Sequence, residues 1–136
     1  QPFKVMDTHT LLIMDTHILP AIASGGMVVT PHPLQNGSVI RARPVGMLAM
    51  SDEAGGDNKI IAVPISKVTP LYDKVVNAKN LPESLLGSIE HFFEHYKDLC
   101  PGKWVKITGW HDARAACKEI LESIAMYEKM RDGTAV

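Results

Sequence analysis

The sequence contains no segment suited to crossing a membrane. Its longest apolar stretch, residues 18–29, is interrupted by Pro20, Ser24 and two glycines and is too short to span a bilayer. The stretch also lacks a basic flank at its start, which a secretory signal requires. We therefore expect neither a membrane span nor a secretory signal.

Cysteine and surplus charge are both scarce. The two cysteines, Cys100 and Cys117, lie on separate expected elements and match neither a zinc-binding spacing nor a disulfide framework. This usage favours two reduced thiols in a cytoplasmic protein. Lys and Arg number 14 against 15 Asp and Glu, a net charge of −1 without any basic run. This balance excludes the broad positive surface of a general nucleic-acid binder, so any anionic ligand must be met by local charge.

What the sequence does supply is enough apolar material for one domain. Of its 136 residues, 46% are hydrophobic and 21% are charged, which fits a single globular domain over residues 1–136 with a real core. The tetrapeptide MDTH occurs twice, starting at Met6 and at Met14, but two copies do not make a solenoid.

Each MDTH copy places an aspartate two residues before a histidine. Residues two apart in an extended strand point to the same face, so Asp7 with His9, and Asp15 with His17, would each offer a metal one oxygen and one nitrogen. The alternative is a solvated strand face or a frayed terminus, because Asp-x-His alone is a weak signal.

The middle of the chain has the alternation and turn residues of an antiparallel sheet. The Asn-Gly pair at residues 36–37 is a strong turn signal before an alternating strand at residues 39–45, in which Arg41 and Arg43 share one face. That face is either solvated or a clamp for an anion. Further strands are expected over residues 59–65 and in the segment KWVKITGW.

The spacing of apolar residues predicts two helices. The first has Pro82 in its first turn, and the second runs from about residue 113 to residue 130 behind a capping Asp112. Both are expected to pack on the sheet, which gives an α+β fold: an antiparallel sheet or barrel with two packed helices. The expected apolar stripes are Leu85, Leu86, Ile89, Phe92, Phe93, Tyr96 and Leu99 in the first helix, and Ala116, Cys117, Ile120, Leu121, Ile124 and Tyr127 in the second.

The loop SDEAGGDNK, residues 51–59, is the main candidate site. It places Asp52 and Asp57 around a Gly-Gly pair, with Lys59 two residues further on. Mg²⁺ prefers carboxylate oxygens, and a lysine beside them would meet a phosphate. From these residues alone, a charged hairpin loop and a metal site are both open.

The first helix carries a second polar group in the segment HFFEHYKDL. His91 and His95 lie one turn apart, but the His-Glu-x-x-His order of zinc proteases is absent, so an interface or surface role is favoured. Lys97 suits the C-terminal end of a helix dipole, and Tyr96 has a simple interpretation as a core residue.

Four segments together resemble the C-terminal two-thirds of bacterial family I soluble inorganic pyrophosphatases. In chain order they are PHPLQNGSVIRARPVGML, SDEAGGDNKIIAVP, IEHFFEHYKDL and GKWVKITGW, and the resemblance covers about residues 28–127. It implies an OB-like antiparallel barrel, Mg²⁺-dependent hydrolysis of pyrophosphate in the cytoplasm, and hexamers with His91 and His95 at a subunit contact. Residues 1–27 would then be a divergent or truncated segment before a family-like core at residues 28–136.

The resemblance also implies a role for each remaining candidate residue. Asp52 and Asp57 resemble the aspartates that bind the catalytic Mg²⁺ ions, and Asp57 and Lys59 resemble catalytic residues. Lys59, together with Tyr96 and Lys97, resembles the set that binds phosphate oxygens.

One family motif is not matched. Family members carry Asp-Gly-Asp-Pro-x-x-Asp just upstream, and an ungapped alignment puts its three aspartates on Pro20, Ile22 and Gly25, whereas a gapped one brings Asp15 close to the first. Three hypotheses follow: a pyrophosphatase, an inactive relative that binds pyrophosphate or a partner, and a metalloprotein that uses the Asp/His cluster within residues 7–17. That cluster would favour Zn²⁺, Co²⁺ or Mn²⁺ over Mg²⁺.

Overall fold

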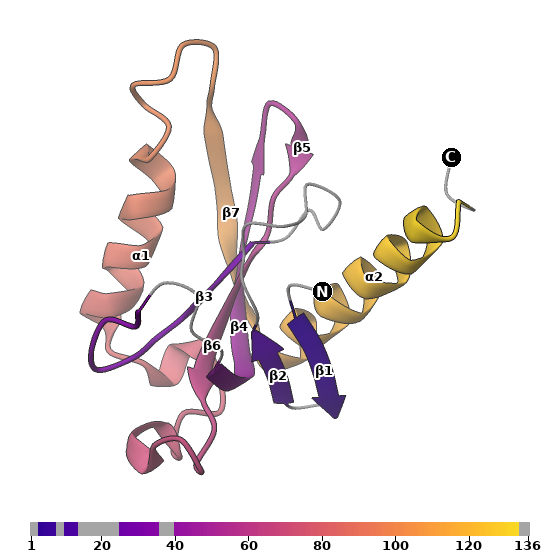
Figure 1. Ribbon diagram of the computed structural model, residues 1–136. Coiled ribbons are helices and arrows are strands. Elements are labelled where there is room, and N and C mark those ends of the chain that lie inside the picture. Colours follow the sequence, from indigo (N-terminus) through magenta and orange to yellow (C-terminus); the bar gives the residue numbers. More distant parts are fainter. Residues whose placement is uncertain (1–2, 8–9, 14–24, 36–39, 134–136) are drawn as a thin grey trace.

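The computed structural model of the chain describes residues 3–7, 10–13, 25–35 and 40–133. In these residues one sheet carries a helix on each side, and the C-terminal half of the second helix projects beyond the sheet (Figure 1). The strands are β1 (Phe3–Asp7), β2 (Thr10–Ile13), β3 (Gly26–Val28), β4 (Ile40–Asp52), β5 (Gly55–Gly56), β6 (Lys59–Pro64) and β7 (Val105–Asp112). The helices are η1 (Pro70–Tyr72), η2 (Ala78–Asn80), α1 (Glu83–His95) and α2 (Ala113–Arg131).

Strand β4 is the centre of the sheet. The strand order is β1-β2-β4-β6-β3, and β5 and β7 also pair with β4. The register shifts between Pro44 and Gly46 against β6, and between Ala49 and Met50 against β7. Such irregularities bend a strand, so β4 can pair with different partners along its length.

The predicted α+β architecture is confirmed, with one exception to its antiparallel pairing. Strand β3 pairs with β6 in parallel. The chain reverses between β3 and β4 and again between β4 and β6, so β3 and β6 run the same way. Within the described residues no pairing joins β1 to β3, the two ends of the order, so closure into a barrel stays a prediction.

The strand expected over residues 39–45 is too short. In the structure β4 continues to Asp52. Residues 44–48 are all buried, because both faces of the sheet are covered there. A strand buried on both faces loses its alternation of apolar and polar residues, which was the signal used to predict its length.

Two apolar clusters lie on opposite faces of the sheet. One packs α1 against the sheet and the other packs α2 (Figure 1). Burial of these side chains is the main favourable term in folding. The first cluster contains Val45, Leu48, Met50, Ile61, Val63, Leu81, Ile89 and Phe93, and the second contains Met47, Ile60, Ala116 and Ile120.

The core stripe predicted for α1 is only partly correct. Ile89 and Phe93 are buried as expected, whereas Phe92 and Tyr96 are exposed. The helix ends at His95 with Tyr96 as its C-cap, so Leu99 falls outside the helix and is 97% exposed. Helical spacing therefore extended the stripe past the real end of the helix.

The prediction for α2 is closer. The Asp112 side chain accepts a hydrogen bond from the backbone N–H of Ala115 at 2.9 Å, as expected of an N-cap. Asn77 Oδ1 accepts from the N–H of Ala113 at 2.9 Å and so satisfies a second N–H of the first turn. Leu121, expected in the apolar stripe, is 53% exposed, although Ile120 before it and Ile124 after it belong to or pack against the cluster, so Leu121 faces away from the sheet.

Two sequence-based expectations concern the chain as a whole. No helix in the described part of the chain is long and apolar enough to cross a bilayer. No disulfide joins Cys100, which is exposed, to Cys117, which is half-buried.

Candidate active site

The two aspartates of the main candidate loop lie on one face of a tight hairpin. Asp52 pairs with Gly55 across β4 and β5, and the N–H of Asp57 donates to the carbonyl of Met50 at 2.9 Å. Asp57 thus lies opposite Met50. Met50 is two residues before Asp52 in the same strand, and residues two apart in a strand share a face, so the two aspartates point to the same side. The turn forms because Ala54 N–H donates to Asp52 Oδ1 at 2.9 Å and because Gly55 adopts a φ of 117° that favours glycine.

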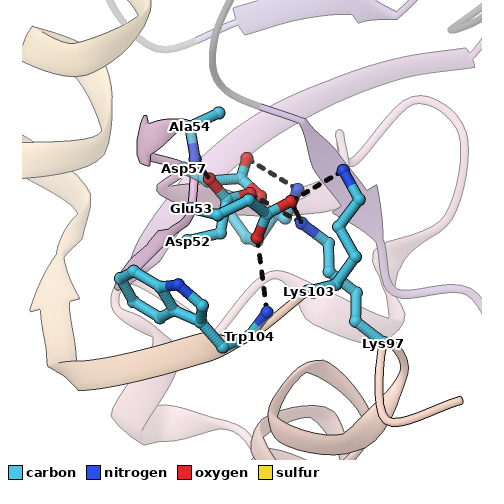
Figure 2. A network of polar contacts seen from close by, with 8 residues as sticks. Asp52, Glu53, Ala54, Asp57, Lys97, Lys103 and Trp104 are labelled. Carbon is cyan, nitrogen blue, oxygen red and sulfur yellow. Dashed lines mark hydrogen bonds and ion pairs between the residues drawn. The ribbon is translucent and has the colours of Figure 1, made fainter. Parts of the chain in front are cut away.

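Each aspartate holds a lysine that the sequence analysis had also selected. Lys97 Nζ lies 2.7 Å from Asp52 Oδ2, and Lys59 Nζ lies 2.8 Å from Asp57 Oδ1. Only 10% of the Asp52 side chain and 15% of the Asp57 side chain are exposed. Figure 2 shows the Asp52 carboxylate next to the Lys97 ammonium group, although Lys97 follows α1 and Asp52 belongs to the hairpin.

The Lys97–Asp52 contact sets the protonation of both groups. The hydrogen bond from Lys97, aided by the Ala54 N–H, holds the pKa of Asp52 below its usual range, although burial alone would raise it. The same hydrogen bond raises the pKa of Lys97 above its usual value. Both groups are therefore charged at neutral pH and form a true ion pair.

Lys59 is held by the surrounding fold. Its Nζ lies 5.6 Å from the ring centroid of Phe93 on α1, a cation–π distance. The carbonyl of Gly25 accepts from the N–H of Ile60 at 3.0 Å, and a Cβ at position 25 would lie 3.2 Å from Lys59 Nζ. Position 25 therefore borders the ammonium group directly.

Tyr96 lies beside Lys97 at the edge of the site. Lys97 Nζ is 5.5 Å from the centroid of the Tyr96 ring, which stacks on Phe92 at 5.6 Å. Since Tyr96 is 39% exposed, its predicted place in the core is wrong.

The predicted interface histidines form a pair on α1. The ring centroids of His91 and His95 are 4.5 Å apart, and His95 Nδ1 lies 2.9 Å from Asp98 Oδ2. His95 is about half exposed. The interface role of both histidines stays a prediction.

Glu53 and Lys103 join the site although the sequence analysis did not select them. Lys103 Nζ lies 2.9 Å from Glu53 Oε1, and the same oxygen is 3.8 Å from Lys97 Nζ. The Lys103 hydrogen bond holds the pKa of Glu53 below its usual range. Glu53 directly follows Asp52, which was the available signal, whereas Lys103 offered none because its segment was interpreted only as a strand.

Arg43 turns out to be structural. It donates to the carbonyls of Val75 and Tyr72, the latter at 2.5 Å, and so fastens the η1 segment to β4. Arg41 on the same strand face is exposed. Arg41 and Arg43 therefore form neither of the two expected arrangements, a clamp for an anion or a solvated face.

A grouped set of metal-ligating side chains is absent from the described part of the chain. There, no three His, Cys, Asp or Glu residues are grouped so as to hold a metal ion. The proposed N-terminal cluster lies mostly outside the described residues, which omit His9, Asp15 and His17, and only the backbone of Asp7 is described, at the end of β1. That hypothesis therefore stays a prediction.

Comparison with known proteins decides the family. The family model for inorganic pyrophosphatase matches residues 26–128. This chain belongs to that family. The inorganic pyrophosphatase of Yersinia pestis is 60% identical over 103 residues, which cover 76% of this chain and 59% of that protein. The enzyme of Escherichia coli K12 is 59% identical over 97 residues, which cover 71% of this chain and 55% of that protein.

Solved structures agree with this assignment. The inorganic pyrophosphatase of Helicobacter pylori superposes with a TM-score of 0.74 at 35% sequence identity, and the match covers 89% of this chain and 72% of that one. The predicted resemblance over residues 28–127 is thereby confirmed.

The family match leaves part of the relatives unmatched. The chain spans about three fifths of the length of the curated relatives it matches. Of the three positions to which the ungapped alignment assigns the family aspartates, only Gly25 is described, and it places no carboxylate beside Lys59. Pro20 and Ile22 lie outside the described residues.

Proposed function

We propose that this chain hydrolyses pyrophosphate to two phosphates with Mg²⁺. One arrangement carries the proposal: Asp52 and Asp57 share a face of the hairpin, and each holds a lysine ammonium that a phosphate oxygen would also attract. Carboxylates for a cation and ammonium groups for an anion suit a substrate that binds as a metal–phosphate complex. The 60% identity to an inorganic pyrophosphatase supports the same substrate.

The two carboxylates fit Mg²⁺ as donors. This ion prefers hard oxygen ligands, keeps several waters, and often binds through one or two carboxylates together with phosphate oxygens. Asp52 and Asp57 would hold it. When bound, it would lower the pKa of a coordinated water and neutralise charge on the phosphate.

The remaining site residues would act on the anion. Lys59 and Lys97 would pair with phosphate oxygens and stabilise the charge of the transferred phosphoryl group. Tyr96, exposed beside Lys97, would donate a hydrogen bond from its hydroxyl. Phe93 under Lys59 would keep that ammonium in position.

The test is phosphate release from pyrophosphate with and without Mg²⁺. We expect Mg²⁺-dependent turnover that falls to background in Asp57→Ala, because the variant loses a ligand and leaves Lys59 without its partner. Glu122→Gln is the matched control, since within the described residues Glu122 forms only an exposed pair with Lys118 at 3.9 Å. Turnover by Asp57→Ala equal to that of the unchanged protein would reject the site assignment.

A second candidate is a relative that binds pyrophosphate without hydrolysing it. The observation that favours it is Gly25, which offers no carboxylate next to Lys59 where the ungapped alignment expects one. Calorimetry with a non-hydrolysable pyrophosphate analogue separates the two candidates. Tight binding without turnover supports this second candidate, and turnover eliminates it.

The proposed setting follows the family. We infer a cytoplasmic protein whose partners are pyrophosphate, phosphate and further copies of the same chain, assembled as a hexamer. His91 and His95, on the exposed side of α1, are the proposed contact residues. Their exposure within one chain is compatible with burial against a second copy.

A further inference from the structure

Glu53 contacts both ends of the segment that carries Lys97. At one end its Oε1 is 3.8 Å from Lys97 Nζ, and at the other its Oε2 accepts from the N–H of Trp104 at 3.3 Å. Its Oε1 also lies 2.9 Å from Lys103 Nζ. Figure 2 shows the Glu53 carboxylate between these groups, so one side chain ties residues 97–104 to the β4–β5 hairpin.

The hydrogen bond between Glu53 and Trp104 lies just beyond the end of the pairing between β4 and β7. Asp52 and Val105 are the last residue pair between β4 and β7. The next N–H, that of Trp104, has no backbone partner across the ladder and is met by the Glu53 side chain instead. The Glu53 carboxylate is therefore fixed by the fold, with 24% of the side chain exposed.

Lys97 consequently lies between two carboxylates at unequal distances, 2.7 Å from Asp52 and 3.8 Å from Glu53. Asp52 cannot offer the same oxygen fully to Lys97 and to a cation. Glu53 is a second, fixed carboxylate that the Lys97 ammonium group reaches by a short movement. Asp52 can therefore release Lys97 without leaving the ammonium group unpaired.

We propose that Glu53, anchored by Lys103 and Trp104, is a positioning residue for Lys97. It receives the ammonium when Asp52 ligates a cation, and it holds Lys97 within reach of a phosphate oxygen. The inference rests on the proposed pyrophosphate site and adds to it a residue that does not itself touch the substrate.

Two variants separate positioning from a simple effect of charge. Glu53→Gln keeps the size and one acceptor but removes the charge. Glu53→Asp keeps the charge, but its side chain is one methylene shorter and cannot reach Lys97, Lys103 and Trp104. If only the local field mattered, Glu53→Asp would behave like the unchanged protein.

The measurement is calorimetric binding of inorganic phosphate over a series of Mg²⁺ concentrations, with circular dichroism to confirm folding. We expect both variants to need about fivefold more Mg²⁺ for half-maximal phosphate binding, the loss of one partly exposed ion pair. In hydrolysis, KM for pyrophosphate should rise more than kcat falls. Glu122→Gln, on an unrelated surface, should change neither quantity.

The outcomes distinguish this inference from the proposed function. If the unchanged protein binds no phosphate at any Mg²⁺ concentration, the proposed function fails. If it binds and Glu53→Asp matches it, Glu53 acts only through charge and the positioning role is overturned. If both variants match the unchanged protein, Glu53 only holds residues 97–104 against the hairpin, and the positioning role is overturned.

Discussion

The Lys97–Asp52 ion pair links the end of α1 to the hairpin of β4 and β5. The two side chains are 19% and 10% exposed, so their interaction is screened less than a surface pair. Because folding lowers the pKa of Asp52, its contribution to stability is present above the ordinary value of 3.8 and is lost as pH falls through the lowered value. Because folding raises the pKa of Lys97, the matching contribution is present below 10.5 and is lost in stronger alkali.

Lys97→Met should therefore destabilise the protein in a pH-dependent way. At pH 7 we expect a loss of about 1–3 kcal/mol in the free energy of unfolding, because Asp52 keeps its charge without an ammonium partner. The difference should shrink as pH falls below 3.8, where Asp52 is protonated in the unfolded chain and then in the folded one. Urea unfolding of both proteins between pH 2.5 and pH 8 measures it.

Lys118→Met provides the control for this prediction. Lys118 is 78% exposed and pairs with Glu122 at 3.9 Å, so its loss should change stability by less than about 0.5 kcal/mol. A Lys97→Met variant whose stability loss is the same at pH 3 and pH 7 would show that the lost energy is packing and not charge.

At the scale of elements, η2 packs closely on β4 near the start of α2. A Cβ at Gly46 would lie 2.5 Å from the Cβ of Ala78 and 3.0 Å from the carbonyl oxygen of His111. Asn77 directly precedes η2, and its side-chain oxygen accepts a hydrogen bond from the N–H of Ala113, the first residue of α2. The absence of a side chain at position 46 thus lets η2 reach the start of α2.

Gly46→Ala should destabilise the protein by about 1–3 kcal/mol, because the backbone of η2 or β7 must move to admit the methyl group. Gly87→Ala is the matched control. Gly87 is exposed within α1 with nothing within 4 Å of its Cβ position, so alanine there should stabilise by up to about 1 kcal/mol. Thermal unfolding of the two variants gives the answer, and equal melting temperatures would refute the steric argument.

At the scale of the whole molecule, the proposed assembly of several copies would place α1 at a contact between them. The ring centroids of His91 and His95 are 4.5 Å apart on the exposed side of α1, with the ring planes tilted by 46°. Glu94 and Asp98 both pair with His95. If two copies meet through this face, protonated imidazoles from both would repel one another.

We therefore expect sedimentation velocity to show a larger species at pH 8 than at pH 5. The double variant His91→Gln with His95→Gln should lose this pH dependence, since it lacks both imidazoles of the proposed contact. The same species at both pH values in the unchanged protein would argue against the proposed contact.

Local sequence determined much of the fold. Asp112 accepts from the N–H of Ala115 at a helix start, and Asp52 accepts from the N–H of Ala54 in a tight turn, so each residue forms its element through contacts a few positions away. The pairing of Asp57 with Lys59 is likewise local, because residues two apart in an extended segment share a face. Such features can be derived from spacing alone.

Tertiary structure decided the rest. Lys97 meets Asp52 across 45 positions, and Glu53 meets Trp104 across 51, because β7 returns alongside β4 and brings the end of α1 with it. No local rule encodes such a contact, since it depends on which strands pair and in what register. The full length of β4 was equally hidden, because burial on both faces erases the alternation that marks a strand.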